Sequence, residues 1–194
     1  MPELPQPLEN APPADAAHTL RLHSTDFEIF GVQARFGVQT QELVAAYHKL
    51  QNRMHPDRFA NGSAAEKRLA VQWATRINEA WHRLKNPVER AIYLCQLHNH
   101  NPRANQTQLE PVLLMQQMEW REQLQESATE QSLHTLKATV LAERKRLLQQ
   151  AEQQLDTQKH WQAASQTCQA LLFVEKFLSE IAKKTEWLED ASDD

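Results

Sequence analysis

The chain has 194 residues, enough for one large domain or two small ones. It contains only three glycines, is rich in Ala, Leu, Gln and Glu, and has no alternating Val/Ile/Thr-rich run, so we expect an all-α protein. The formal net charge of -4 argues against a general nucleic-acid binder, which would carry a basic stripe to meet phosphates.

Residues 1–23 are rich in Pro, Ala and Glu with few bulky side chains, and we expect a disordered tail. This stretch lacks the charged start and apolar middle of a secretory signal, and no apolar run in the chain reaches the length of a membrane span. The two cysteines, Cys95 and Cys168, lie in apolar helical patterns, which predicts two small buried side chains and no disulfide or metal framework. We therefore expect a soluble, cytoplasmic protein without membrane contact.

The first helices are predicted from caps and apolar spacing. Thr25 and Glu28 form a capping-box pattern before a short helix that stops at Gly31. A longer helix from Thr40 to Met54 has its apolar residues on one face, and a second capping box, Ser63 with Glu66, opens a helix with a matching apolar stripe. Two such helices should pack antiparallel as a hairpin.

Between these helices stands the tripeptide His55-Pro56-Asp57. Proline disfavours helical geometry in the residue before it and donates no backbone hydrogen bond, so the chain must turn here on a stiff corner. Taken alone, the tripeptide would be no more than a helix end and a turn. Lys49, Arg53 and Arg58 surround it with positive charge, which would favour an acidic partner.

A further helix begins at Asn86-Pro87, where Asn caps and Pro occupies the first turn, and the polar residues 99–110 are expected to be a linker. Three longer helices with short connections follow, which predicts a small up-down-up bundle over residues 111–188. The capping pattern from Ser127 to Glu130 marks the start of the second of them.

The helix at 111–126 has more apolar residues than one core face needs. Leu113, Trp120 and Leu124 can line the bundle, which leaves a second stripe of apolar and acidic side chains: Leu114, Met115, Met118, Glu119, Glu122 and Glu126. Repeated glutamates repel one another, and a basic partner would relieve that repulsion. Phe173 and Phe177 on the last helix could extend this stripe; the alternative for the apolar members is a wide buried face.

Several runs together resemble one family. They are His55-Pro56-Asp57-Arg58-Phe59-Ala60, Ile77-Asn78-Glu79-Ala80-Trp81, Leu84-Lys85-Asn86-Pro87, Arg90-Ala91-Ile92-Tyr93-Leu94 and Leu114-Met115-Gln116-Gln117-Met118-Glu119-Trp120-Arg121-Glu122. The hairpin resembles a J-domain, and the chain from about residue 25 to 185 resembles the HscB type of J-domain co-chaperone in iron-sulfur cluster assembly. No cysteine precedes the hairpin, so the resemblance is to the bacterial type and no zinc or other cofactor is expected.

The resemblance implies a J-domain at 24–98, a linker at 99–110 and a client-binding three-helix bundle at 111–188. HscB proteins stimulate the ATPase of HscA, a DnaK-type chaperone, and bring it IscU, the scaffold for iron-sulfur clusters. By position, the HscA contact falls on His55, Pro56, Asp57, Lys49, Arg53 and Arg58. The IscU contact falls on Leu114, Met115, Met118, Glu119, Glu122, Glu126 and Phe173.

Three other functions compete with this one. The protein could be a J-domain co-chaperone for a different DnaK-type chaperone and client, or a helical adaptor without J-type activity. An enzyme using His55 and Asp57 as an acid-base pair would need a nucleophile, a glycine-rich phosphate loop or a metal cluster, and the sequence offers none of these. We therefore expect no catalytic residues in this chain.

Overall fold

Helices make up all the regular structure in the described part of the chain. The computed structural model describes residues 22–104 and 111–192. Its elements are α1 (Asp26–Phe30), α2 (Thr40–Met54), the 3-10 turn η1 (Pro56–Phe59), α3 (Ala64–Lys85), α4 (Pro87–Leu97), α5 (Pro111–Glu126), α6 (Glu130–Glu152), the π-helical turn η2 (Gln153–Gln158) and α7 (Trp161–Ser192). The predicted all-α class is confirmed.

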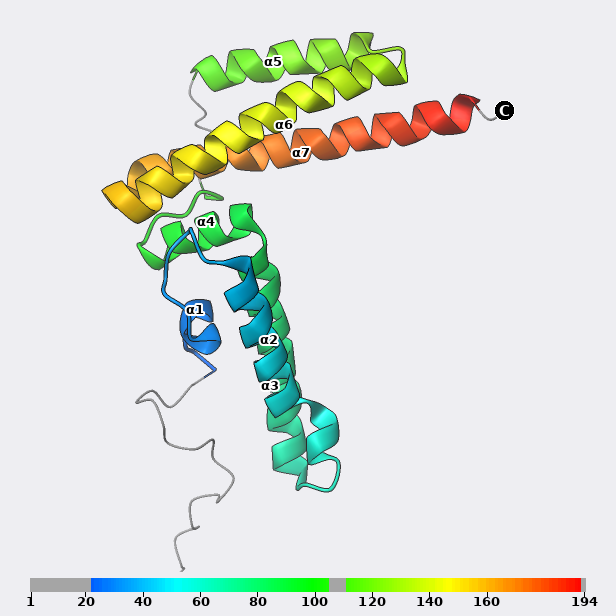
Figure 1. Ribbon diagram of the computed structural model, residues 1–194. Coiled ribbons are helices and arrows are strands. Elements are labelled where there is room, and N and C mark those ends of the chain that lie inside the picture. The colour runs from blue at the N-terminus through cyan, green and yellow to red at the C-terminus, as the bar shows by residue number, and fades with distance from the viewer. Residues whose placement is uncertain (1–21, 105–110, 193–194) are drawn as a thin grey trace, which may run out of the picture.

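The N-terminal unit is the predicted antiparallel hairpin of α2 and α3, with α1 packed on its side (Figure 1). The capping box of α1 is confirmed, because the Thr25 hydroxyl accepts from the Glu28 amide and the Glu28 carboxylate accepts from the Thr25 amide. Gly31 ends this helix at φ 64°, a left-handed conformation that glycine adopts without strain. Local signals therefore place α1 as the sequence predicts.

A buried carboxylate ties α1 to the rest of this unit. Asp26 is fully buried, and its two oxygens lie 2.6 Å from Arg76 and 2.7 Å from Arg83, both on α3. The Asp26 amide donates to the Tyr93 hydroxyl of α4 at 2.9 Å. Charge pairing offsets the cost of burying this carboxylate, so the network orients α1 on α3 and α4.

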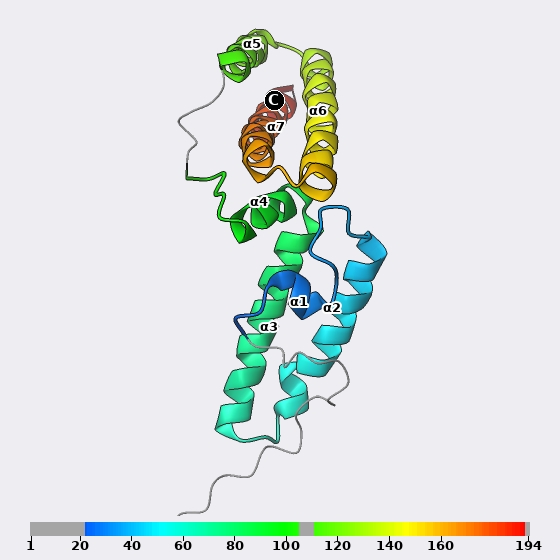
Figure 2. The same ribbon diagram turned by 90° about the vertical axis from the view of Figure 1, so that its left-hand side faces the viewer.

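The C-terminal unit is built on α6 and α7, which lie side by side and carry α5 (Figures 1 and 2). Trp120 of α5 is only 3% exposed, so its predicted place in the core is confirmed. It stacks on Phe177 with ring centroids 5.5 Å apart. Of the two places left open for Phe177, the core is the correct one, because its side chain is fully buried beneath Trp120.

The start of α6 also differs from the prediction. The capping box joins Thr129 to Ser132, whose hydroxyls and amides exchange hydrogen bonds of 3.2 and 3.3 Å. Ser127 is buried and its hydroxyl donates to the Gln123 carbonyl in the last turn of α5. Ser127 therefore ends the preceding helix instead of opening the next one.

Helix α4 joins the two units, since it packs on α3 below and on α6 and α7 above (Figure 2). Most of the predicted tail, residues 1–21, and part of the predicted linker, 105–110, lie outside the described residues, so the domain boundaries stay predictions. Among the helices of residues 22–104 and 111–192, none has the length and apolar character that a bilayer span requires.

Cys95 of α4 and Cys168 of α7 meet inside this contact. Both are fully buried and free, as the sequence predicts, and their thiols are hydrogen-bonded to each other. That hydrogen bond and burial raise the pKa of the Cys168 thiol, while the same hydrogen bond lowers the pKa of the Cys95 thiol. Neither side chain is exposed, so burial keeps a soluble reagent away from both.

We therefore predict that both thiols are silent toward a soluble disulfide reagent in the folded protein. Two thiols per chain should react once denaturant unfolds it. Titration of released thiolate by absorbance measures this directly, and rapid labelling of the native protein would contradict it.

Candidate functional site

The corner at the far end of the hairpin forms as the sequence predicts. Helix α2 ends at Met54, His55 is extended at φ -63° and ψ 129°, and Pro56 begins the turn η1. The Asp57 amide donates to Nδ1 of His55 at 3.3 Å. Since Nδ1 accepts this bond, its 3.6 Å approach to the Asp57 carboxylate is not an ion pair. The two side chains are 56% and 90% exposed and free to meet another molecule.

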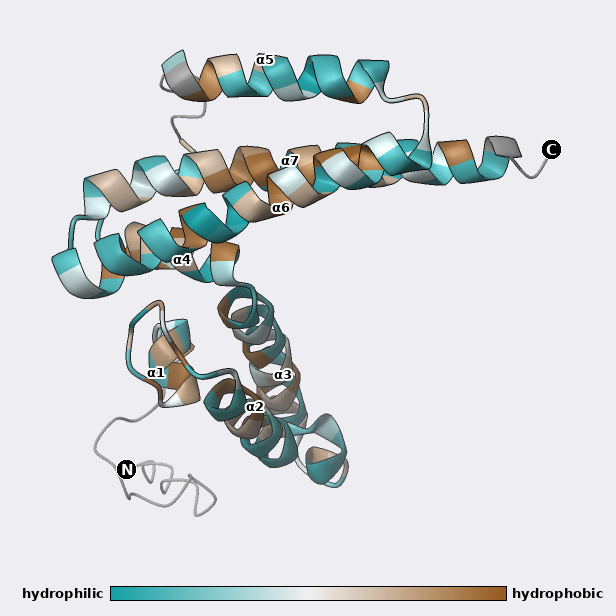
Figure 3. Ribbon diagram, turned by 45° about the horizontal axis from the view of Figure 1, so that its top comes forward, coloured by the Kyte–Doolittle hydropathy of each residue, from teal (hydrophilic) through white to brown (hydrophobic). Residues whose placement is uncertain are grey.

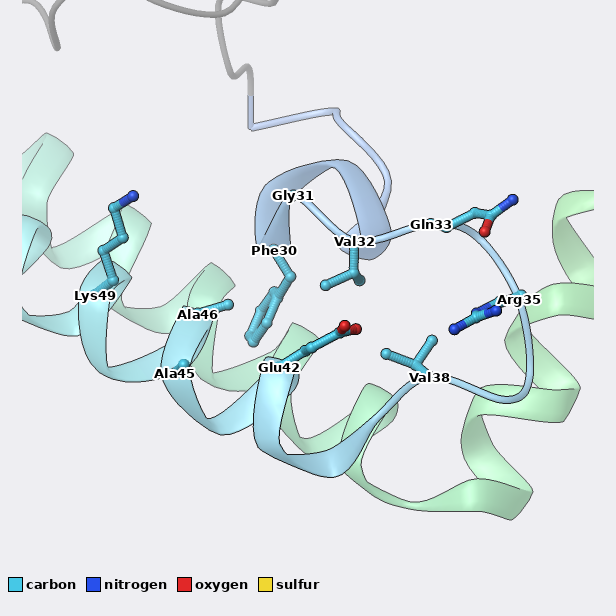
Figure 4. A pocket seen from close by; sticks show the side chains of 10 residues that line it. All are labelled: Phe30, Gly31, Val32, Gln33, Arg35, Val38, Glu42, Ala45, Ala46 and Lys49. Carbon is cyan, nitrogen blue, oxygen red and sulfur yellow. The ribbon is translucent and has the colours of Figure 1, made fainter.

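The basic residues predicted beside the corner do not all behave alike. Arg58 donates from Nη1 to the Asn52 carbonyl at 3.1 Å, which closes the corner back onto α2. Lys49 is exposed and Arg53 is half-buried. Figure 4 shows Lys49 at one end of a shallow hollow between α2 and the loop after α1, with Arg35 at the other end. Glu42 lies between them in the lining of the hollow, so the positive charge near the corner is interrupted along α2.

Polar and aromatic contacts between α2 and α3 hold the hairpin stiff. The Tyr47 hydroxyl donates to Oδ1 of Asn78 at 3.0 Å, and the Gln51 amide bonds to both. The Tyr47 ring stacks on Trp81 with centroids 4.6 Å apart. A corner carried on such a scaffold loses little conformational entropy on binding.

The second predicted surface is the outer face of α5. Leu114, Met115 and Met118 are exposed by 46%, 65% and 72%. The three glutamates predicted with them, Glu119, Glu122 and Glu126, are exposed as well. Figure 3 shows apolar segments of α5 set within a largely hydrophilic helix. We call these six side chains the α5 patch.

Phe173 is half-buried and its ring lies 6.0 Å from Trp120 and 5.9 Å from Phe177. It packs against the core, where the three rings all contact one another. Its assignment to the binding surface stays a prediction. Part of the Phe173 ring is already buried in contacts within the bundle.

The corner and the α5 patch lie at opposite ends of the molecule, with α4 between them (Figures 1 and 2). Within residues 22–104 and 111–192, no group of three or more His, Cys, Asp or Glu side chains is placed to hold a metal ion. The geometry leaves two separate exposed surfaces, one on the hairpin and one on α5.

Comparison with known proteins identifies the family. The chain is 40% identical over 172 residues to a co-chaperone protein HscB homolog of Burkholderia mallei, which covers 87% of this chain and 98% of that protein. A homolog of Burkholderia thailandensis is equally similar at 40% identity over 172 residues. This chain belongs to the HscB co-chaperone family.

Other comparisons agree with this membership. A family model described as the HSCB C-terminal oligomerisation domain matches residues 109–182. Chaperone HscB from Vibrio cholerae is 33% identical, with a TM-score of 0.75 over 85% of this chain and 99% of that one. Human co-chaperone protein HscB, at 24% identity, shares the fold with a TM-score of 0.82 over 94% of each chain.

The predicted family and fold are thus confirmed, while the individual site residues stay predictions. Sequence reasoning missed one set of residues that the HscB fold brings together, the junction of the hairpin with the bundle. Asp156 bonds there to the amides of Phe36 and Gly37, which lie 120 and 119 positions away in the chain. No local pattern could have shown this pairing.

Proposed function

We propose that this protein stimulates the ATPase of an HscA-type chaperone and brings it the scaffold IscU, so that it assists iron-sulfur cluster assembly in the cytoplasm. The observation that supports this most is the presence of two chemically different exposed surfaces, the corner and the α5 patch, at opposite ends of one molecule. A protein with one binding surface would not need this arrangement.

The corner is the proposed chaperone contact. Its positive edge, Lys49 and Arg53 with Arg58, would steer an acidic surface onto His55 and Asp57. ATP is hydrolysed in the partner, and this chain contributes by binding the hydrolysis-competent conformation more tightly than the others. Such an action requires no catalytic group here.

The α5 patch, together with Phe173, is the proposed scaffold contact. Flexible methionine side chains adapt to an uneven partner surface, and the glutamates would pair with basic residues around it. Apolar anchors surrounded by charge are the usual composition of a specific interface.

ATPase stimulation of purified HscA by this protein, with and without IscU, tests the proposal. We expect stimulation by the protein alone and a larger rate when IscU is present. No stimulation in either condition would overturn the proposed function.

A Leu114→Ala/Met118→Ala double variant should bind IscU about 30-fold or more weakly, because truncated interface anchors commonly cost about 1 to 2 kcal/mol each. Both side chains are exposed, so its thermal melt should match that of the parent. Leu141→Ala, a similarly exposed leucine on α6, is the control and should bind normally. Calorimetric titration measures the affinities; an early or non-cooperative melt of the double variant would show that these side chains are core.

A further inference from the structure

One carboxylate of the bundle holds the loop between α1 and α2. Asp156, on the π-helical turn η2, accepts from the Phe36 amide through Oδ1 at 2.7 Å and from the Gly37 amide through Oδ2 at 2.8 Å. Two bonds to two adjacent amides define both a position and a direction, as a single bond would not. This pair of bonds crosses from the bundle to the hairpin unit.

The π-helical turn places Asp156 where it can do this. Leu155 is buried beneath η2, and Lys159 ends the turn in the left-handed conformation at φ 55°. The Thr167 hydroxyl of α7 donates to Oε1 of Gln154 at 2.8 Å and holds the turn against its neighbour. π-helical turns are rare and occur frequently at functional sites.

A buried cation supports the carboxylate. The Arg90 guanidinium lies 5.2 Å over the Phe36 ring and donates to the Leu84 carbonyl at 2.5 Å. Burial lowers the pKa of Arg90, and the charges of Asp156 and Glu152 oppose that change, so Arg90 remains a cation. Two amide donors thus hold Asp156, and the Arg90 charge attracts it without a direct hydrogen bond between them.

The backbone at Gly37 lies close to the side chains of Asp156 and Glu152. A Cβ atom on Gly37 would lie 3.3 Å from Oδ2 of Asp156 and 3.1 Å from Oε1 of Glu152. Since Asp156 is held by its two hydrogen bonds, it has little freedom to withdraw. A side chain at position 37 would therefore crowd the contact, and Asp156 would have to shift by a few tenths of an ångström to admit it.

The remaining contacts of this junction are less directional. Helix α4 packs on α7 through buried apolar side chains, and His98 stacks flat on Trp161 at 3.6 Å. Apolar and stacking contacts depend less on direction than a carboxylate bound to two neighbouring amides, which favours one orientation.

We infer that Asp156 is a positioning residue, which fixes the hairpin relative to the bundle so that a client on α5 strengthens the stimulation delivered by the His55 corner. The inference rests on the proposed function. A client held at a set place beside the chaperone has a high effective concentration there, and a loosened junction would reduce it without altering either binding surface.

The geometric part is tested on the full-length protein without partners. Spin labels at Val71→Cys on α3 and Leu141→Cys on α6, both exposed positions, report the distance between the units. We expect Asp156→Asn, which presents an amide donor to one of the two N–H groups, to broaden the distance distribution. Exchange of the Phe36 or Gly37 amide should become roughly 2- to 10-fold faster.

Two further variants sharpen this test. Gly37→Ala perturbs the same contact from the opposite side and should also broaden the distribution. Glu152→Gln changes the neighbouring acid, which makes no hydrogen bond to the loop amides, and should leave the distribution as in the parent. Parent-like distributions in both Asp156→Asn and Gly37→Ala would overturn the positioning role.

ATPase and binding measurements on Asp156→Asn separate the effect of IscU on stimulation from the binding of each partner. Asp156→Asn should bind HscA and IscU separately with parent affinities, while the extra ATPase stimulation that IscU adds falls to roughly half or less. An undiminished IscU effect in Asp156→Asn, with an active parent, would overturn the coupling. If the parent itself stimulates nothing, the proposed function fails, and the distance distributions alone decide whether Asp156 positions the units.

Discussion

A His55→Gln variant is expected to lose the stimulation of HscA while melting at the temperature of the parent. The His55 side chain is more than half exposed and its internal contact is one 3.3 Å bond from the Asp57 amide. An exposed substitution of this kind changes the free energy of unfolding by roughly 0.5 kcal/mol or less. Glutamine keeps the polarity and removes the imidazole, so the loss should appear in function alone.

His82→Gln is the matched control, since it makes the same exchange at an exposed histidine near the other end of α3. Steady-state ATPase rates, with the melt followed by circular dichroism, measure both properties. Equal stimulation by His55→Gln and the parent would show that the corner is only a turn.

A Trp120→Ala variant is expected to lose about 3 to 5 kcal/mol of stability, as is usual when a buried aromatic side chain is truncated. Trp120 is the fully buried anchor of α5 and lies against two rings of α7. At the end of the helix, Lys184 donates to the Leu124 and Gln125 carbonyls. Without the indole, α5 would keep this contact and partly buried side chains such as Leu113.

Chemical denaturation of Trp120→Ala and of Trp187→Ala compares the loss of stability when a buried and an exposed tryptophan are removed. Trp187 is 64% exposed on the same bundle, so its removal should have little effect on the denaturation midpoint. Trp120→Ala should also lose IscU binding, because the α5 patch depends on a docked α5. A parent-like midpoint for Trp120→Ala would mean that α5 is held mainly by other contacts.

Local features of this protein could be predicted because their causes lie within a few residues. Pro56 ends α2 whatever surrounds it, and the capping boxes at Thr25 and Ser63 join partners three positions apart. The two-sided character of α5 was also visible, since apolar residues exceeded what one core face could use. Prediction went wrong at the cap of α6 and could not decide between core and surface for Phe177, because competing patterns were equally good locally.

The sequence by itself determined the helices, the stiff corner at His55-Pro56-Asp57 and the outward stripe of α5, since propensity, caps and periodicity act over one or two turns. Only the tertiary structure decided that Phe177 is fully buried while Phe173 is half-buried, and that Cys95 meets Cys168. It also decided that Asp156 accepts from the amides of Phe36 and Gly37. These depend on contacts between residues up to 120 positions apart, which helical patterns do not encode. The two ends of the molecule are thus specified locally, and the junction that relates them is a product of packing.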